Sequence, residues 1–177
     1  MTENRLTPQS QRAFAALLDE IVGRLAKDVL SVKQRMNERG ILPSSQTVWE
    51  IYQCVDAAIT EMGKAAAESA RLSYEAGHHK YSAALESELL DAFEHNFSLG
   101  FERLSAVRAS EAQVIARGLQ NLKMLESTEH LEVGKRAQTT GQLELRQYFQ
   151  TLKRGRKRWY EYIPLVAQIA MWLSKGH

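Results

Sequence analysis

The sequence of 177 residues has one cysteine, three prolines and no long hydrophobic run. The small number of prolines favours helix, and the other two scarcities exclude classes of protein. The single cysteine, Cys54, cannot form an internal disulfide and is typical of a reducing compartment. The longest apolar stretch, residues 163–173, would rise only about 16 Å as a helix, too little to cross roughly 30 Å of hydrocarbon. The N-terminal residues are polar and lack the apolar core of a secretory signal. We therefore expect a cytoplasmic protein.

Short motifs that carry common enzyme chemistry are also absent from the sequence. It has no glycine-rich phosphate-binding loop, no His-Glu-x-x-His zinc motif, no Gly-x-Ser-x-Gly nucleophile motif and no paired Cys-x-x-Cys. We therefore expect a protein that is not an enzyme and that has no cofactor and no metal site.

The abundant residues favour helix. Hydrophobic residues make up 44% and charged residues 25% of the chain, as in ordinary globular proteins. Apolar residues recur at steps of three and four, and no stretch alternates as a strand would. For the first helix, Thr7 is the predicted N-cap, Pro8 follows in the first turn, and Gly40 is the predicted left-handed C-terminal cap.

A second helix is predicted from Thr47 to Gly77. Thr47 and Glu50 have the spacing of a capping box, in which each side chain accepts from a free backbone N–H of the other residue. An apolar stripe runs from Val48 to Leu72, and the alanines around it would let a neighbouring helix approach closely.

A third helical region extends from about residue 80 to Gly134, with Phe93, Phe97 and Phe101 as its expected core. A break near residues 108–111 would divide it into two helices, but no glycine or proline lies there. The pattern slightly favours one continuous helix.

The C-terminal part is predicted as shorter pieces. Gly134 to Gly141 reads as the main connector, and a short helix over residues 143–152 follows it. Pro164 disfavours helical geometry just before it, which predicts a joint near residues 160–163 and a short final helix.

The predicted fold is all-α. It is an elongated antiparallel bundle of three to five long helices with a short C-terminal helix. Residues 1–134 form the body, and residues 135–177 form a basic helical segment packed on it or extending from it, within one domain overall.

Charge divides the chain in the same place. Residues 1–134 contain 14 basic and 19 acidic residues, whereas residues 135–177 contain nine basic and two acidic ones. The basic residues concentrate in a basic cluster, residues 153–160, which ends in two aromatics: Lys153, Arg154, Arg156, Lys157, Arg158, Trp159 and Tyr160. Such an asymmetry indicates a polyanionic or acidic partner.

Three interpretations of the basic cluster remain open. Its cations could contact successive phosphates of a nucleic acid, with the aromatics stacking on exposed bases. Together with residues 163–173 it could instead lie on an anionic membrane surface. It could also be a solvated helix end that complements the helix dipole.

The interpretation we adopt is a non-catalytic helical binding protein whose basic C-terminal segment contacts a polyanion, which we expect to be the phosphates of a nucleic acid. The alternative is an adaptor or assembly protein that binds other proteins through apolar helix faces. A homo-oligomer is expected in either case, because long helices expose more apolar surface than one chain covers.

The remaining chemical candidates are isolated residues and pairs. Glu75 with His78 has the Glu-x-x-His spacing of di-iron bundles, but no second such pair exists. Two other pairs have the i, i+4 spacing of helix neighbours, and both are expected to be solvated: Asp91 with His95, and Glu126 with His130. Cys54 lies in the apolar stripe and is expected to be a buried, inert thiol.

Overall fold

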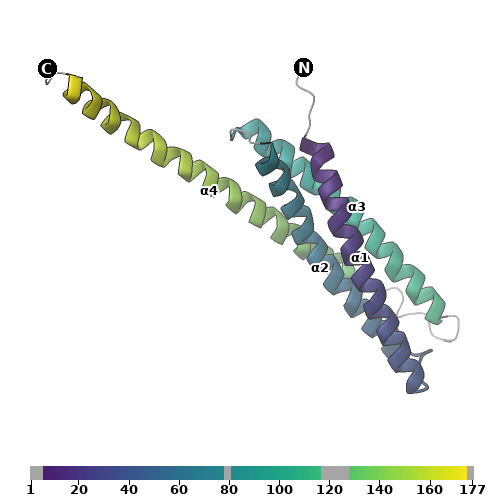
Figure 1. The fold of residues 1–177 in the computed structure, drawn as a ribbon. Coiled ribbons are helices and arrows are strands. Elements are labelled where there is room, and N and C mark those ends of the chain that lie inside the picture. Colours follow the sequence, from purple (N-terminus) through teal and green to yellow (C-terminus); the bar gives the residue numbers. More distant parts are fainter. Residues whose placement is uncertain (1–5, 78–80, 117–127, 175–177) are drawn as a thin grey trace.

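The computed structural model contains four helices, α1 (Leu6–Glu38), α2 (Ser45–Ala76), α3 (Ala83–Ala116) and α4 (Glu129–Ser174) (Figure 1). It describes the backbone of residues 6–77, 81–116 and 128–174, and the side chains of residues 8–77, 81–115 and 128–154. Within these ranges there is no strand, so the prediction of an all-α bundle is confirmed.

Helix α1 buries one apolar stripe and ends at a glycine. Seven residues at steps of three and four form the buried stripe: Phe14, Leu18, Ile21, Leu25, Val29, Val32 and Met36. Gly40 has a φ of 70°, its N–H donates to Asn37 O at 2.9 Å, and Ile41 N–H donates to Met36 O at 2.9 Å. This is the Schellman arrangement, and it confirms the predicted cap. The helix begins at Leu6, so Thr7 lies in its first turn rather than at the N-cap.

The start of α2 differs from the prediction. Its N-cap is Ser44, whose Oγ accepts from Thr47 N–H at 3.2 Å, so the predicted capping box at Thr47 and Glu50 is wrong. Thr47 is buried and donates to Ile41 O at 3.1 Å, while Glu50 forms an ion pair with Arg35 of α1. Three neighbouring hydroxyl residues, Ser44, Ser45 and Thr47, can each cap a helix, so the spacing of Thr47 and Glu50 did not identify the cap.

Helix α2 is the centre of the bundle, because α1, α3 and α4 all pack on it (Figure 1). The stripe from Val48 to Ala66 is buried as predicted, and the helix ends before Gly77 as predicted. Leu72, expected in the same stripe, is 42% exposed.

The predicted helix from residue 80 to Gly134 is divided, but not at residues 108–111. Helix α3 ends at Ala116 and α4 begins at Glu129, so the favoured continuous helix is wrong. The predicted connector from Gly134 to Gly141 is also wrong, because both glycines are buried inside α4.

These glycines occur where α4 approaches its neighbours most closely. A Cβ on Gly141 would lie 2.8 Å from Gly63 O and 2.6 Å from the Phe93 ring, and a Cβ on Gly63 would lie 2.8 Å from Ala137 O. The sequence predicts Gly141 as the end of a connector, but in the structure Gly141 and Gly63 let the backbones of α2 and α4 come into contact.

Helices α2 and α4 run in the same direction, and the spacing between their axes increases towards their C-terminal ends (Figure 1). Small residues meet first, at Gly63 and Gly141. Further along both helices Tyr74 meets Tyr148 edge-on, with ring centroids 6.0 Å apart. Because larger side chains separate helix axes, α4 diverges from α2 towards its C-terminus (Figure 1).

Helix α4 continues to Ser174 without the predicted joint at residues 160–163. Pro164 removes one backbone donor, but the helix continues past it. The C-terminal residues are therefore the end of a helix of 46 residues and not a separate short helix.

Candidate functional site

The basic cluster begins where α4 leaves the bundle. Phe149 is 1% exposed and Leu152 packs partly on the core, whereas Arg154 is exposed. Beyond this point the backbone of α4 is helical to Ser174 and runs away from the other three helices (Figure 1). The cluster therefore lies at the junction between the packed and the projecting parts of α4.

The first residue of the cluster contacts the start of α3. Lys153 Nζ lies 2.8 Å from Glu86 Oε2 and 5.4 Å from the centroid of the Tyr81 ring. The Tyr81 hydroxyl donates to the same carboxylate oxygen. Lys153 thus has an acidic and an aromatic partner, both outside α4.

Local sequence explains the position of Glu86. Ser82 Oγ accepts from Leu85 N–H at 3.2 Å and so caps the first turn of α3. Glu86 lies in that turn, where the positive end of the helix dipole favours a carboxylate. Tyr81 immediately precedes the cap, and its ring also lies 6.4 Å from that of Phe149.

The electrostatics of this contact favour the charged form of both partners. Hydrogen bonds from Lys153 and then from Tyr81 lower the pKa of Glu86, outweighing its partial burial. The hydrogen bond to Glu86 raises the pKa of Lys153. At neutral pH the contact is therefore an ion pair.

The other predicted site residues divide into two groups. Arg154 is exposed. Five residues have a helical backbone but side chains outside the described ranges: Arg156, Lys157, Arg158, Trp159 and Tyr160. Of the described pair, Lys153 contacts the body and Arg154 faces solvent.

The paired metal and acid–base candidates do not form a site among the described residues. Asp91 and His95 are both exposed, and no group of three potential metal ligands occurs in the described ranges. His78 and Glu126 lie outside those ranges. His130 stacks on Phe101 with ring centroids 6.0 Å apart.

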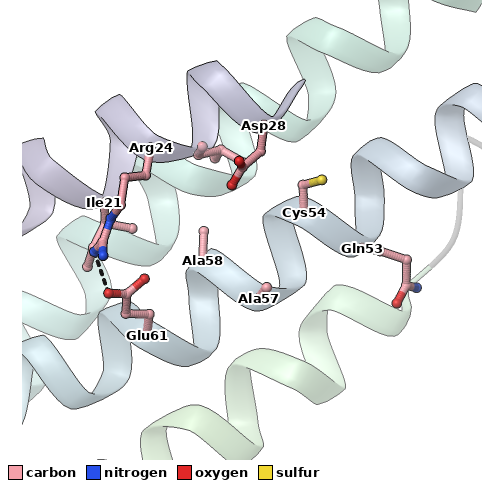
Figure 2. A pocket seen from close by; sticks show the side chains of 9 residues that line it. Ile21, Arg24, Asp28, Gln53, Cys54, Ala57, Ala58 and Glu61 are labelled. Carbon is pink, nitrogen blue, oxygen red and sulfur yellow. Dashed lines mark hydrogen bonds and ion pairs between the residues drawn. The ribbon is translucent and has the colours of Figure 1, made fainter. Parts of the chain in front are cut away.

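Cys54 lies in a groove of about 360 Å³ between α1 and α2 (Figure 2). Arg24 and Glu61 form an ion pair across one end, and Asp28 lies near the thiol. The thiol is half-buried rather than fully buried as predicted. Burial, and then the carboxylates of Asp28 and Glu50, raise its pKa, which makes it a poor nucleophile.

Sequence reasoning missed a buried polar cluster that joins three helices. Asn96 Nδ2 donates to Ser10 Oγ at 3.0 Å and to Ser69 Oγ at 3.2 Å, and all three residues are fully buried. No donor from the described residues reaches Asn96 Oδ1. The signal was available, because Asn96 lies directly beside Phe97 in the buried face of α3.

Sequence reasoning also missed a buried cation. Arg108 is 6% exposed, and its guanidinium carbon lies 3.5 Å from the centroid of the Tyr52 ring. Nearby, burial raises the pKa of Asp56, while the charge of Arg108 opposes that shift. Arg108 follows the buried Leu104 by four residues, so its position on the buried face of α3 was the signal that could have identified it.

Across the described residues, no helix is both long enough and apolar enough to cross a bilayer. The chain matches no protein-family model, no curated protein and no solved structure.

Proposed function

We propose that the protein is a non-catalytic binding protein whose basic cluster contacts the phosphates of a nucleic acid. The observation that carries the proposal is the course of α4, which continues as a single helix beyond Phe149 and Leu152, its last core residues among the side chains that the structure describes. The five cations of the cluster start at that point.

Helical geometry supports contact with phosphates rather than with base edges. Successive positions on a helix turn by about 100°, so the positions 153, 154, 156, 157 and 158 cover an arc of about 200°, more than half of the circumference. Such a distribution places charge on several sides of α4 but does not form one face that fits a groove. It favours binding through charge, with weak dependence on base sequence.

The charge of the body indicates which part of the protein a nucleic acid would contact. Residues 1–134 have an excess of acidic residues, which repel a polyanion. A nucleic acid would therefore contact the projecting part of α4 and avoid the surfaces of α1, α2 and α3.

The test is binding to a labelled duplex and a labelled single strand between about 50 and about 200 mM salt. Replacing Arg156, Lys157 and Arg158 together with alanine should reduce the slope of log affinity against log salt by about 2–3. The matched control replaces three exposed cations of the body, Arg12, Lys27 and Lys64, and should leave the slope nearly unchanged. Equal effects of both triple variants would contradict the proposal.

Trp159→Ala distinguishes the two nucleic acid forms. Loss of a stacking platform should cost about 1–3 kcal/mol on a single strand, and a duplex bound only through phosphates should be little affected. A protein that ignores nucleic acid but sediments with anionic vesicles would instead use the cluster at a membrane surface. A protein that does neither would favour the adaptor function.

A further inference from the structure

The two described cations of the basic cluster have different surroundings. Both are exposed, but Lys153 contacts the Glu86 carboxylate and the Tyr81 ring, whereas Arg154, the next residue, forms no ion pair with a described residue. If every cation of the cluster served only to bind phosphate, an acidic partner at one of them would weaken binding. The Glu86 contact therefore requires an explanation of its own.

We infer that Glu86 is an internal competitor for phosphate, which occupies Lys153 in the free protein and is displaced when a nucleic acid binds. The inference rests on the proposed function and adds a means of regulating it. Glu86 Oε2 occupies the position beside the ammonium that a phosphate oxygen would take, at a distance of 2.8 Å.

Exposure makes the exchange feasible. The side chains of Lys153 and Glu86 are 46% and 21% exposed, so a phosphate can approach the ammonium from solvent. Replacing one exposed ion pair by another changes the free energy little. Lys153 should therefore add little to the affinity of the wild-type protein, although it lies within the cluster.

The position of the contact connects binding to the bundle. Glu86 lies in the first turn of α3, and Lys153 lies one turn beyond Phe149 on α4. Displacing Glu86 removes an ion pair between α3 and α4 at the point where α4 leaves the bundle. A bound nucleic acid should therefore loosen this junction while the core contacts of Phe149 persist.

The principal test is Glu86→Gln, with Asp91→Asn as the matched control. Both variants remove one negative charge from α3, but Asp91 is exposed and lies more than a turn further along the helix. Glu86→Gln should remove the ion pair that a phosphate must displace and raise the affinity for a duplex by about two- to fivefold, whereas Asp91→Asn should raise it less.

Two further substitutions identify the cation that is released. Arg154→Ala should weaken wild-type binding and reduce its salt slope by about 0.9. Lys153→Ala should change the wild-type affinity by less than about twofold, because the phosphate contact that it removes only replaces the ion pair with Glu86. In the Glu86→Gln background, Lys153→Ala should return the affinity to the wild-type value. Circular dichroism of each variant verifies that the helices are intact.

The outcomes separate the two proposals. If the Arg156, Lys157 and Arg158 variant loses binding but Glu86→Gln behaves as Asp91→Asn does, the competitor inference is wrong and the proposed function stands. Binding by Glu86→Gln alone, with none by the wild-type protein, would support the inference in its strongest form. If neither protein binds a duplex or a single strand, both proposals are wrong.

Discussion

The two parts of α4 differ in charge and in packing, although they form one continuous helix. Residues 129–152 contain three acidic and three basic residues and pack on α2 and α3. Residues 153–174 contain five basic residues and one acidic residue, and this part of the helix projects beyond the bundle (Figure 1). The packed part uses small residues where it meets other helices, and the projecting part begins with a concentration of charge.

The comparison agrees with our proposal that the first part of this continuous helix packs on the bundle and the second part binds a partner. Packing of the first part fixes the direction of the whole helix, because Gly141 and Ala137 set its closest approach to α2. The second part continues in that direction because the helix is unbroken, and it needs no contacts of its own to fix its course. Substitutions in the first part should therefore affect folding, and substitutions in the second part should affect binding.

The largest expected effect is on the packed part. Phe93 is fully buried, and its ring lies beside Gly141, so it forms part of the surface on which α4 lies. Phe93→Ala should lower the free energy of unfolding by about 3–5 kcal/mol, since it leaves a cavity between three helices. Leu99→Ala on the exposed side of α3 is the control and should stay within about 0.5 kcal/mol. Denaturant titration measures both, and comparable effects would mean that the buried faces of α3 are assigned wrongly.

Two glycine substitutions with smaller and opposite effects on stability test the close approach of α4 to α2. Gly141→Ala should destabilise the fold by about 1–3 kcal/mol, because its methyl group would collide with Gly63 O and the Phe93 ring. Gly23→Ala, in an open position on α1, should instead stabilise the fold by about 0.5–1 kcal/mol through helix propensity. Equal stabilisation by both substitutions would show that α4 does not approach α2 at Gly141.

The features that sequence predicted are those encoded locally. The buried stripe of α1, its cap at Gly40 and the burial of Phe93 and Phe97 follow from spacing along one segment. Asn96 and Arg108 could have been identified in the same way, since each lies in the register of buried residues.

Other features that the sequence analysis missed have no local signal, because they depend on a partner from another helix. Gly141 resembles a break until Gly63 is placed opposite it. Likewise Lys153 resembles its neighbours in the basic cluster, because its partner Glu86 belongs to a different helix. The difference in contacts between Lys153 and Arg154 is therefore a property of packing and has no local signal.

The smallest expected effect is the pH dependence of the contact at the junction. The pKa of Glu86 is lowered from its usual 4.5, so its contribution to stability is present above that pH and is lost as the pH falls through the lowered value. The pKa of Lys153 is raised from 10.5, so its contribution is present below that pH and is lost as the pH rises through the raised value. The wild-type protein should therefore melt slightly above Glu86→Gln at neutral pH, and the difference should vanish in acid and decrease in strong alkali, where Lys153 is neutral. Thermal unfolding of both proteins across this range is the measurement, with Lys153→Met expected to show the same loss at neutral pH.

A difference that persists where Glu86 is protonated would mean that Glu86 stabilises the junction by packing rather than by charge, and a phosphate would then have no ion pair to displace.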